Sequence, residues 1–347
     1  MRNLKKGIFI KNILILIPLI IVTGCLKDNV NPLSNFEASD SIAILLYLES
    51  NGDIINSQST ANAFVSASNL YADISNYIIL DIRDPQLFAD GHISGSINII
   101  SSDLLTKIKS IGSTNVILVS QNGQSASYYG GLLRLDGLSN VYILKFGMAG
   151  WNDHFANNWK NASGHSPSGL KYFNNLMYKR GPYTALPEIK FSSSGDIKTK
   201  IENRIEYLLS EKFDDGVVYS NSSSLTVYSQ DAFNTNIYTS SDSTFDGQYI
   251  ACYGDPSLYS ESLQNPNLPY HSPHCAFYQS FHAFKAMYYL QTIPSNKKVV
   301  LYSSSGHLSA FSKAYLELLG YTNVRSLLFG AVWFNPFPGS MNYPYIN

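Results

Sequence analysis

The chain has 347 residues, of which 45% are hydrophobic, and this is enough to build more than one hydrophobic core. Its 24 Lys and Arg balance 25 Asp and Glu without a basic block, so the composition argues against nucleic acid as a partner. The three cysteines form no close-spaced pair, so we expect no metal site and no cofactor.

The first 24 residues have the pattern of an export signal. Basic residues precede the apolar run ILILIPLIIV, which is shorter than the roughly 20 residues that a membrane span needs. The run ends in VTGC, which resembles the lipobox of bacterial lipoproteins and implies cleavage before Cys25 and acylation of that residue. We therefore expect a protein held by lipid on the outer side of a cell-envelope membrane. An ordinary secretory signal with an incidental cysteine is the alternative.

Two domains are predicted for the rest of the chain. A leading helix over SIAILLYLESNGDIIN (41–56) is expected to pack on the first domain, and an amphipathic helix over 197–213 opens the second. The polar stretch NASGHSPSG (161–169) separates them. The predicted divisions are signal peptide 1–24, linker 25–39, first domain 40–160, linker 161–181 and second domain 182–347.

Two short motifs lie in YIILDIRDPQLFADGHISGSINI (77–99). A predicted strand ends at Asp81 and Arg83, and a short helix follows. The chain then turns at Gly91 and His92 into the next strand.

A polar loop follows the predicted strand in VILVSQNGQSASYYGG (116–131) and leads into a helix. Backbone N–H groups converge at such a helix N-terminus and favour an anion or a thiolate. Serine occupies the first loop position, where a nucleophile would sit. The candidate anion-binding residues are Ser120, Gln121, Asn122, Gly123, Gln124 and Ser125.

The same pattern recurs 183 residues later. LLRLDGLSNVYILKFGMAGW (132–151) and YLELLGYTNVRSLLFGAVWF (315–334) agree at eight of twenty positions without gaps. Each unit reads strand, loop, helix, glycine turn and strand, which predicts an α/β fold with a parallel sheet. The second candidate loop is Ser303, Ser304, Ser305, Gly306, His307 and Leu308.

The order of DIRD, GHISG, loop and LKFGMAGW resembles a rhodanese domain, the fold of thiosulfate sulfurtransferases. The resemblance implies two rhodanese-like domains in tandem, each a small parallel sheet flanked by helices. It also implies a scaffold role for His92 in its turn. In this family a cysteine at the first loop position carries a persulfide, and a basic residue often ends the loop. This chain has Ser120 and Ser303 at the first position, and Ser125 and Leu308 at the last.

The second copy is more divergent. ACYGDPSLY (251–259) places Cys252 and Gly254 where the first copy has Asp81 and Arg83. Cys252 and Cys275 are expected to feed neighbouring strands in an oxidising compartment, so a disulfide between them is plausible.

Two functions remain open at this stage. The first is a non-catalytic module that binds a small oxyanion or docks an envelope protein, because serine cannot carry a persulfide. The second is a sulfurtransferase or thiol-redox enzyme that uses Cys252 or Cys275. A serine-hydrolase elbow at GQSAS lacks its last glycine and a placed histidine partner, which disfavours that class. His307 is open too, either as a donor to the anion or as an exposed loop residue.

Overall fold

The computed structural model describes most of the first half of the chain and parts of the second. The residues described are 40–52, 62–163, 184–189, 195–213, 226–227, 249–253, 276–279, 284–285, 290–297, 299–330 and 337–347. Residues Phe36–Asn347 belong to one compact unit, and residues 1–35 lie outside the described residues.

The first sheet has five parallel strands in the order β1-β5-β4-β2-β3. All four residues of the central strand β4 are buried, as expected of an apolar run with helices on both faces. The strands are β1 (Phe64–Val65), β2 (Ile78–Asp81), β3 (Ile97–Asn98), β4 (Val116–Val119) and β5 (Val141–Leu144).

The helices of the first half begin where the sequence supplies caps. Ser66 caps α2 by accepting the N–H of Asn69, and Asp84 caps α3, whose first residue is Pro85. The linker predicted from residue 161 begins later, because α7 continues to Ser163. The helices are α2 (Ala67–Ala72), α3 (Pro85–Ala89), α4 (Leu104–Ile111), α5 (Gln124–Leu135), α6 (Gly147–Trp151) and α7 (Asn157–Ser163).

The second half holds another five-stranded parallel sheet, and its order, β6-β10-β9-β7-β8, corresponds strand for strand to the first. Helix α11 (His307–Leu318) follows β9 as α5 follows β4, and α8 (Ile197–Ser210) precedes the sheet. The strands are β6 (Thr226–Val227), β7 (Tyr249–Tyr253), β8 (Ala276–Gln279), β9 (Val299–Tyr302) and β10 (Val324–Leu327).

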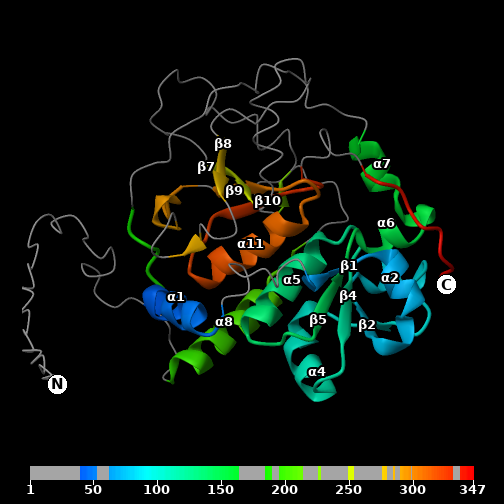
Figure 1. Cartoon of the computed structure of the whole chain (residues 1–347), viewed down its shortest axis with the longest axis horizontal. Coiled ribbons are helices and arrows are strands. Elements are labelled where there is room, and N and C mark those ends of the chain that lie inside the picture. The colour runs from blue at the N-terminus through cyan, green and yellow to red at the C-terminus, as the bar shows by residue number, and fades with distance from the viewer. Residues whose placement is uncertain are drawn as a thin grey trace, which may run out of the picture. The chain divides into compact units, whose positions relative to one another are not determined.

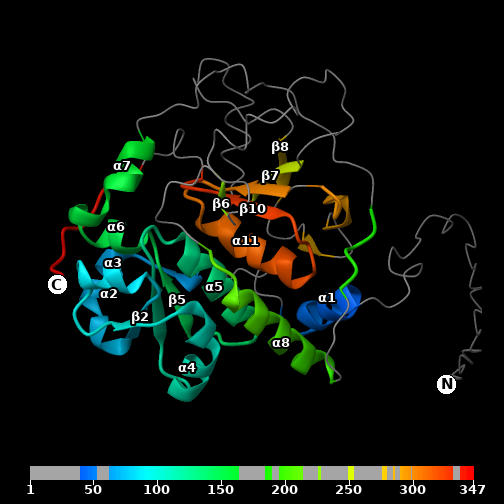
Figure 2. The same ribbon diagram turned by 180° about the vertical axis from the view of Figure 1, so that it is seen from behind.

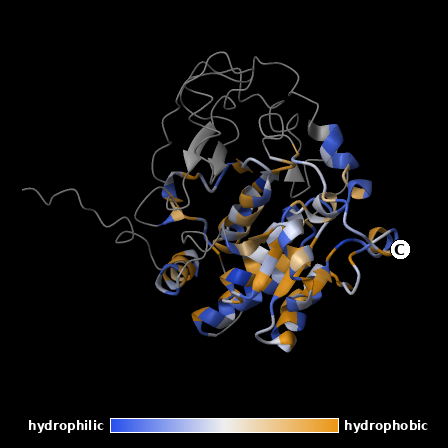
Figure 3. Ribbon diagram, turned by 45° about the vertical axis from the view of Figure 1, so that its right-hand side comes forward, coloured by the Kyte–Doolittle hydropathy of each residue, from blue (hydrophilic) through white to orange (hydrophobic). Residues whose placement is uncertain are grey.

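Helices α5, α8 and α11 lie side by side between the two sheets (Figures 1 and 2). Gly131 lets α5 approach α11 closely, since a Cβ there would lie 3.2 Å from the Ala314 side chain and 3.4 Å from Phe311. The ribbon coloured by hydropathy shows hydrophobic residues along the strands and in stretches of the helices around them (Figure 3). The halves therefore share a buried boundary.

The leading helix α1 (Asp40–Ser50) does not pack where the sequence suggested. It lies against α8, where Lys200 pairs with Asp40 at 3.0 Å, and Ser41 donates to the carbonyl of Pro187. Its buried Ile44 and Leu45 are apolar. Apolar side chains pack without directional bonds, so the sequence does not indicate which half the helix contacts.

Candidate functional site

Loop 1 (Ser120–Ser125) has the converging amides that the sequence predicted. Ser120 Oγ accepts the N–H of Gly123 at 3.0 Å and the N–H of Ala126 at 3.4 Å. Ser120 is 1% exposed, and its hydroxyl occupies the point on which these two amides converge. The Ser120 hydroxyl thus accepts the backbone N–H groups that would otherwise face a bound anion.

Loop 2 (Ser303–Leu308) repeats this arrangement. Ser303 is also 1% exposed, and its Oγ accepts the N–H of Ser309 at 3.3 Å, the bond that corresponds to Ala126 in loop 1. Each serine is therefore buried at the first position of its loop, with its hydroxyl bonded to a backbone N–H at the start of the helix that follows.

A Phe-Gly pair closes each loop from the side. Phe146 and Phe329 have positive φ of 65° and 60°, which is uncommon for a bulky residue. Gly147 follows, and a Cβ on it would lie 2.1 Å from the carbonyl oxygen of Ser120; Gly330 has the same distance to Ser303. These glycines let the turn approach the loop backbone.

Gln124, the first residue of α5, reaches into loop 2. Its Oε1 accepts the N–H of Phe329 at 2.7 Å, and its Nε2 donates to the carbonyls of Leu327 at 3.1 Å and Gly306 at 3.3 Å. The side chain is fully buried. It satisfies backbone groups of the other half rather than an anion in its own loop.

His307 occupies the equivalent position and reaches into loop 1. Its Nε2 accepts the N–H of Phe146 at 3.0 Å, so in the neutral ring Nδ1 carries the hydrogen, beside Ser305 Oγ. Burial, with a smaller effect from Lys145, lowers the pKa of His307 to about 3. Neither sequence interpretation of His307 holds, because the ring is buried and its Nε2 is an acceptor that cannot donate to an anion.

The loop glycines serve this reciprocal insertion, which we call the interlock of Gln124 and His307. A Cβ on Gly123 would lie 2.3 Å from His307 Nε2, and a Cβ on Gly306 would lie 2.4 Å from the Gln124 amide. Both glycines have positive φ, 88° and 76°. The space beside Gly123 is therefore occupied by His307, and the space beside Gly306 by Gln124.

Arg83 and Asp81 form a buried pair at the edge of loop 1. Arg83 Nε and Nη2 donate to the two carboxylate oxygens of Asp81 at 2.9 and 2.7 Å, and Nη2 also donates to the carbonyl of Gly91 at 2.8 Å. Arg83 Nη1 lies 3.4 Å from Gln121 Oε1. The DIRD motif thus ties the Gly91 turn to the loop.

His92 has the scaffold position that the resemblance implied. Its Nδ1 lies 2.9 Å from the carbonyl of Phe88, and its ring stacks on Phe88 with centroids 3.8 Å apart. Its backbone pairs with Ile346, in the segment that returns to the first half at the end of the described chain.

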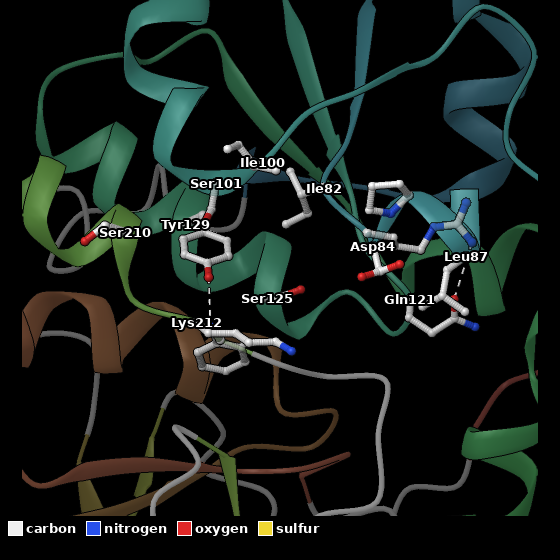
Figure 4. A pocket seen from close by; sticks show the side chains of 13 residues that line it. Ile82, Asp84, Leu87, Ile100, Ser101, Gln121, Ser125, Tyr129, Ser210 and Lys212 are labelled. Carbon is white, nitrogen blue, oxygen red and sulfur yellow. Dashed lines mark hydrogen bonds between the residues drawn. The ribbon is translucent and has the colours of Figure 1, made fainter. Parts of the chain in front are cut away.

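A pocket of about 470 Å³ opens beside loop 1 (Figure 4). Ser125 faces into it, and Lys212 lies across from it (Figure 4). Lys212 and Phe213, which follow α8, both line the pocket. Tyr129 holds these two residues, because its hydroxyl donates to Glu211 O and accepts the N–H of Phe213, both at 2.8 Å. The lining residues are Ile82, Arg83, Asp84, Pro85, Leu87, Ile100, Ser101, Gln121, Ser125, Tyr129, Ser210, Lys212 and Phe213.

Several predicted sites cannot be placed. Cys25 and Cys275 lie outside the described residues. Cys252 lies in β7, which pairs in parallel with β8, the strand that begins directly after Cys275. In the described part of the chain, no three His, Cys, Asp or Glu side chains gather as a metal site, and none of the helices described is long and apolar enough to cross a membrane.

Sequence reasoning missed the interlock and the place of Lys212 and Phe213 in the pocket. The 183-residue offset held the signal for the interlock, since it aligns Gln124 with His307. Nothing in the sequence indicated that Lys212 and Phe213 lie near loop 1, because that contact depends on how α8 packs.

The loop at the N-terminus of α5, the parallel sheet and the Asp81–Arg83 pair lie together in one α/β domain. Residues 66–154 match the family profile described as "Rhodanese-like domain". They form a rhodanese-like domain, and the predicted fold class, α/β with a parallel sheet flanked by helices, is confirmed.

Known proteins resemble this chain over different lengths. A protein of Escherichia coli K12 called "Uncharacterized protein YibN" is 32% identical over 80 residues, which are 21% of this chain and 54% of that protein, so the chain spans about half of this relative. A rhodanese-related protein from Thermoplasma volcanium is 29% identical, over 24% of this chain and 84% of that one, with a TM-score of 0.23. The 3-mercaptopyruvate sulfotransferase SseA of E. coli is 17% identical, over 78% of this chain and 98% of that one, with a TM-score of 0.27.

Proposed function

We propose that this protein is a lipid-anchored tandem rhodanese-like protein of the cell envelope that binds a ligand or partner without sulfurtransferase chemistry. One observation carries the proposal: the hydroxyl of Ser120 fills the nucleophile's position and accepts two loop amides. A persulfide needs a thiolate, and a serine hydroxyl cannot form one. The tandem arrangement is supported by the matching strand orders of the two sheets.

The binding place is the pocket beside loop 1 rather than the loop amides. Those amides already donate to Ser120, whereas the pocket is a cavity of about 470 Å³ lined by polar side chains and by the apolar side chains of Leu87 and Ile100. A small oxyanion is therefore a weaker candidate than a mixed polar and apolar ligand, such as a small organic molecule or the end of a docking protein.

A thiosulfate-to-cyanide assay on residues 26–347 tests the absence of catalysis. We expect no thiocyanate above background, both for this form and for the Cys252→Ala/Cys275→Ala variant. Activity that disappears in the double variant would establish the alternative, an enzyme that uses one of these cysteines. Activity that persists without them would contradict both functions.

A sulfate titration separates the pocket from the loop amides. We expect no sulfate binding at loop 1 in the unmodified protein. Ser120→Ala removes the internal acceptor, so weak millimolar binding should appear at the freed amides. The matched Ser303→Ala variant reports the same for loop 2. Equal sulfate binding with and without Ser120 Oγ would show that the hydroxyl does not block the amides.

Lipid anchoring is tested on the full chain in a bacterial host. Labelled palmitate should enter the protein and the protein should fractionate with membranes, and Cys25→Ala should abolish the labelling. Unlabelled, soluble exported protein would leave the ordinary secretory signal as the correct interpretation.

A further inference from the structure

The segment Ser340–Ile346, which we call the returning segment, lies on the first half, and its residue Asn342 has a positive φ of 55°. Met341 N–H donates to the carbonyl of Gly150 at 3.1 Å, and Tyr343 N–H donates to the carbonyl of Trp151 at 3.0 Å. These bonds satisfy carbonyls at the end of α6 that the helix leaves unpaired.

The bonding continues on both sides of Pro344. Asn152 Nδ2 donates to the carbonyl of Tyr343 and Trp151 Nε1 to that of Pro344, each at 2.8 Å. The segment then forms an antiparallel bridge with His92, whose N–H donates to Ile346 O at 2.8 Å and whose carbonyl accepts from Ile346 N at 2.9 Å. A proline suits this site because its nitrogen has no hydrogen to satisfy.

Two tyrosines fill the hollows between these bonds. Tyr343 stacks on Tyr71 with ring centroids 4.0 Å apart and planes 5° apart. Tyr345 packs edge to face on Phe155 at 4.9 Å and lies over Gly91. A Cβ on Gly91 would lie 2.7 Å from the Tyr345 ring, so the glycine of the GHISG motif makes room for it.

We propose that this groove, lined by Tyr71, Gly91, His92, Trp151 and Phe155, is a peptide-binding site whose ligand is the chain's own returning segment. The recognised element is Tyr-Pro-Tyr, since its backbone pairs with the groove and both rings are seated in it. As in other sites that bind a peptide, backbone hydrogen bonds hold the segment and alternate side chains, Tyr343 and Tyr345, contact the surface beneath it.

Occupation of the groove also supports the loop 1 pocket. Tyr345 packs on Phe155, whose carbonyl accepts Gln121 Nε2 at 3.0 Å, and on Gly91, whose carbonyl accepts Arg83. Gln121 and Arg83 both line the pocket. The segment thus holds two residues of the pocket wall through one intermediate contact each.

The test uses the folded full-length protein with a protease site inserted between Pro338 and Gly339 and cut after folding. We expect the cut segment to remain bound in gel filtration and native mass spectrometry. A labelled synthetic peptide of residues 339–347 in excess should replace it. The same peptide with Tyr345→Ala should compete at least about tenfold less well, since it loses a partly buried ring that contacts Phe155 and Gly91. A peptide with Met341→Ala is the matched control, because Met341 is half exposed.

Hydrogen exchange on the uncut protein keeps the proposal testable if cutting unfolds it. The amides of Met341, Tyr343 and Ile346 should exchange slowly, and Gly91→Ala should remove the protection of Ile346 while the core strands stay protected. Loss of the cut segment without replacement by the peptide would overturn the proposal. Fast exchange of all three amides in the unmodified protein would overturn it too.

Discussion

Loops 1 and 2 have the same backbone path, yet different side chains fill them. Gln124 and His307 each accept the N–H of a phenylalanine in the other half, at 2.7 and 3.0 Å. Gln124 adds donors to backbone carbonyls and has no charge at any pH, whereas His307 can gain a proton. Each side of the interlock therefore needs a buried acceptor for a backbone N–H. Of the two acceptors, only His307 is lost when acid protonates it.

The halves differ more at the periphery of the loops. Loop 1 keeps the Asp81–Arg83 pair and opens beside a pocket, while the corresponding positions of the second half are Cys252 and Gly254 in the sequence. Both loops begin with serine, but the buried Asp81–Arg83 pair and the pocket lie beside loop 1. The proposed binding function therefore concerns loop 1.

The largest effect should come from the glycines that both halves share. Gly147→Ala and Gly330→Ala each place a methyl group 2.1 Å from a backbone carbonyl at a positive φ. Since backbone cannot move aside easily, we expect each to lower the free energy of unfolding by about 3 kcal/mol or more. Urea unfolding of the two variants measures this directly.

Gly137→Ala is the matched control for these variants. Gly137 also has a positive φ, 98°, but nothing lies within 4 Å of a Cβ there. It follows the end of α5, where Leu138 N–H donates to the carbonyl of Leu133 as in a left-handed helix cap. The substitution should cost only about 1 kcal/mol, the strain of the left-handed conformation alone. If Gly147→Ala proved as mild as this control, the close approach of the turn to loop 1 would be wrong.

The next effect separates the two members of the interlock by pH. Because the pKa of His307 is about 3 when folded and near 6.5 when unfolded, acid protonates the unfolded chain first and favours it. Stability is then full above pH 6.5 and falls as the pH drops toward 3. At pH 5 the loss due to His307 should reach about 2 kcal/mol. Urea unfolding at pH 7.5 and 5.0 gives the difference.

His307→Gln makes the second loop resemble the first and supplies the comparison. The variant should lose less stability between pH 7.5 and 5.0 than the unmodified protein, by the same amount of about 2 kcal/mol. Gln124→His should do the reverse and add a second acid-sensitive contact. Identical pH slopes for the unmodified protein and His307→Gln would contradict the burial of a neutral histidine.

Sequence patterns predicted the parts of this molecule that depend on local order. The strand Val116–Val119, the loop, the helix from Gln124 and the converging amides follow from a buried apolar run and a glycine turn, and the structure has them all. The position of Ser120 could be predicted too, because it directly follows the apolar strand. The offset of 183 residues matched the second half to the first at the correct residues.

Contacts between distant segments could not be predicted in this way. Whether His307 is exposed depends on how α11 lies against α5, and no periodicity encodes that packing. The placement of α1 against α8 has the same origin, as does the return of Tyr343 and Tyr345 to the first half. Each contact joins residues more than 100 positions apart and involves a choice among apolar surfaces of similar size.

The smallest effect distinguishes helices α5 and α11. Tyr128 donates to Glu317 Oε2 at 2.6 Å, and Glu317 also pairs with the fully buried Lys313. Burial and the neighbouring carboxylate raise the pKa of Tyr128 well above 10, so it remains a donor. Tyr128→Phe should cost about 1.5 kcal/mol, since a buried charged acceptor loses one bond.

In the second half, Tyr315 donates to the neutral carbonyl of Phe284 at 3.2 Å, so Tyr315→Phe should cost only about 0.5 kcal/mol. Urea unfolding at pH 7.5 compares them, and equal costs would mean that the charge of Glu317 contributes nothing to the boundary between the halves.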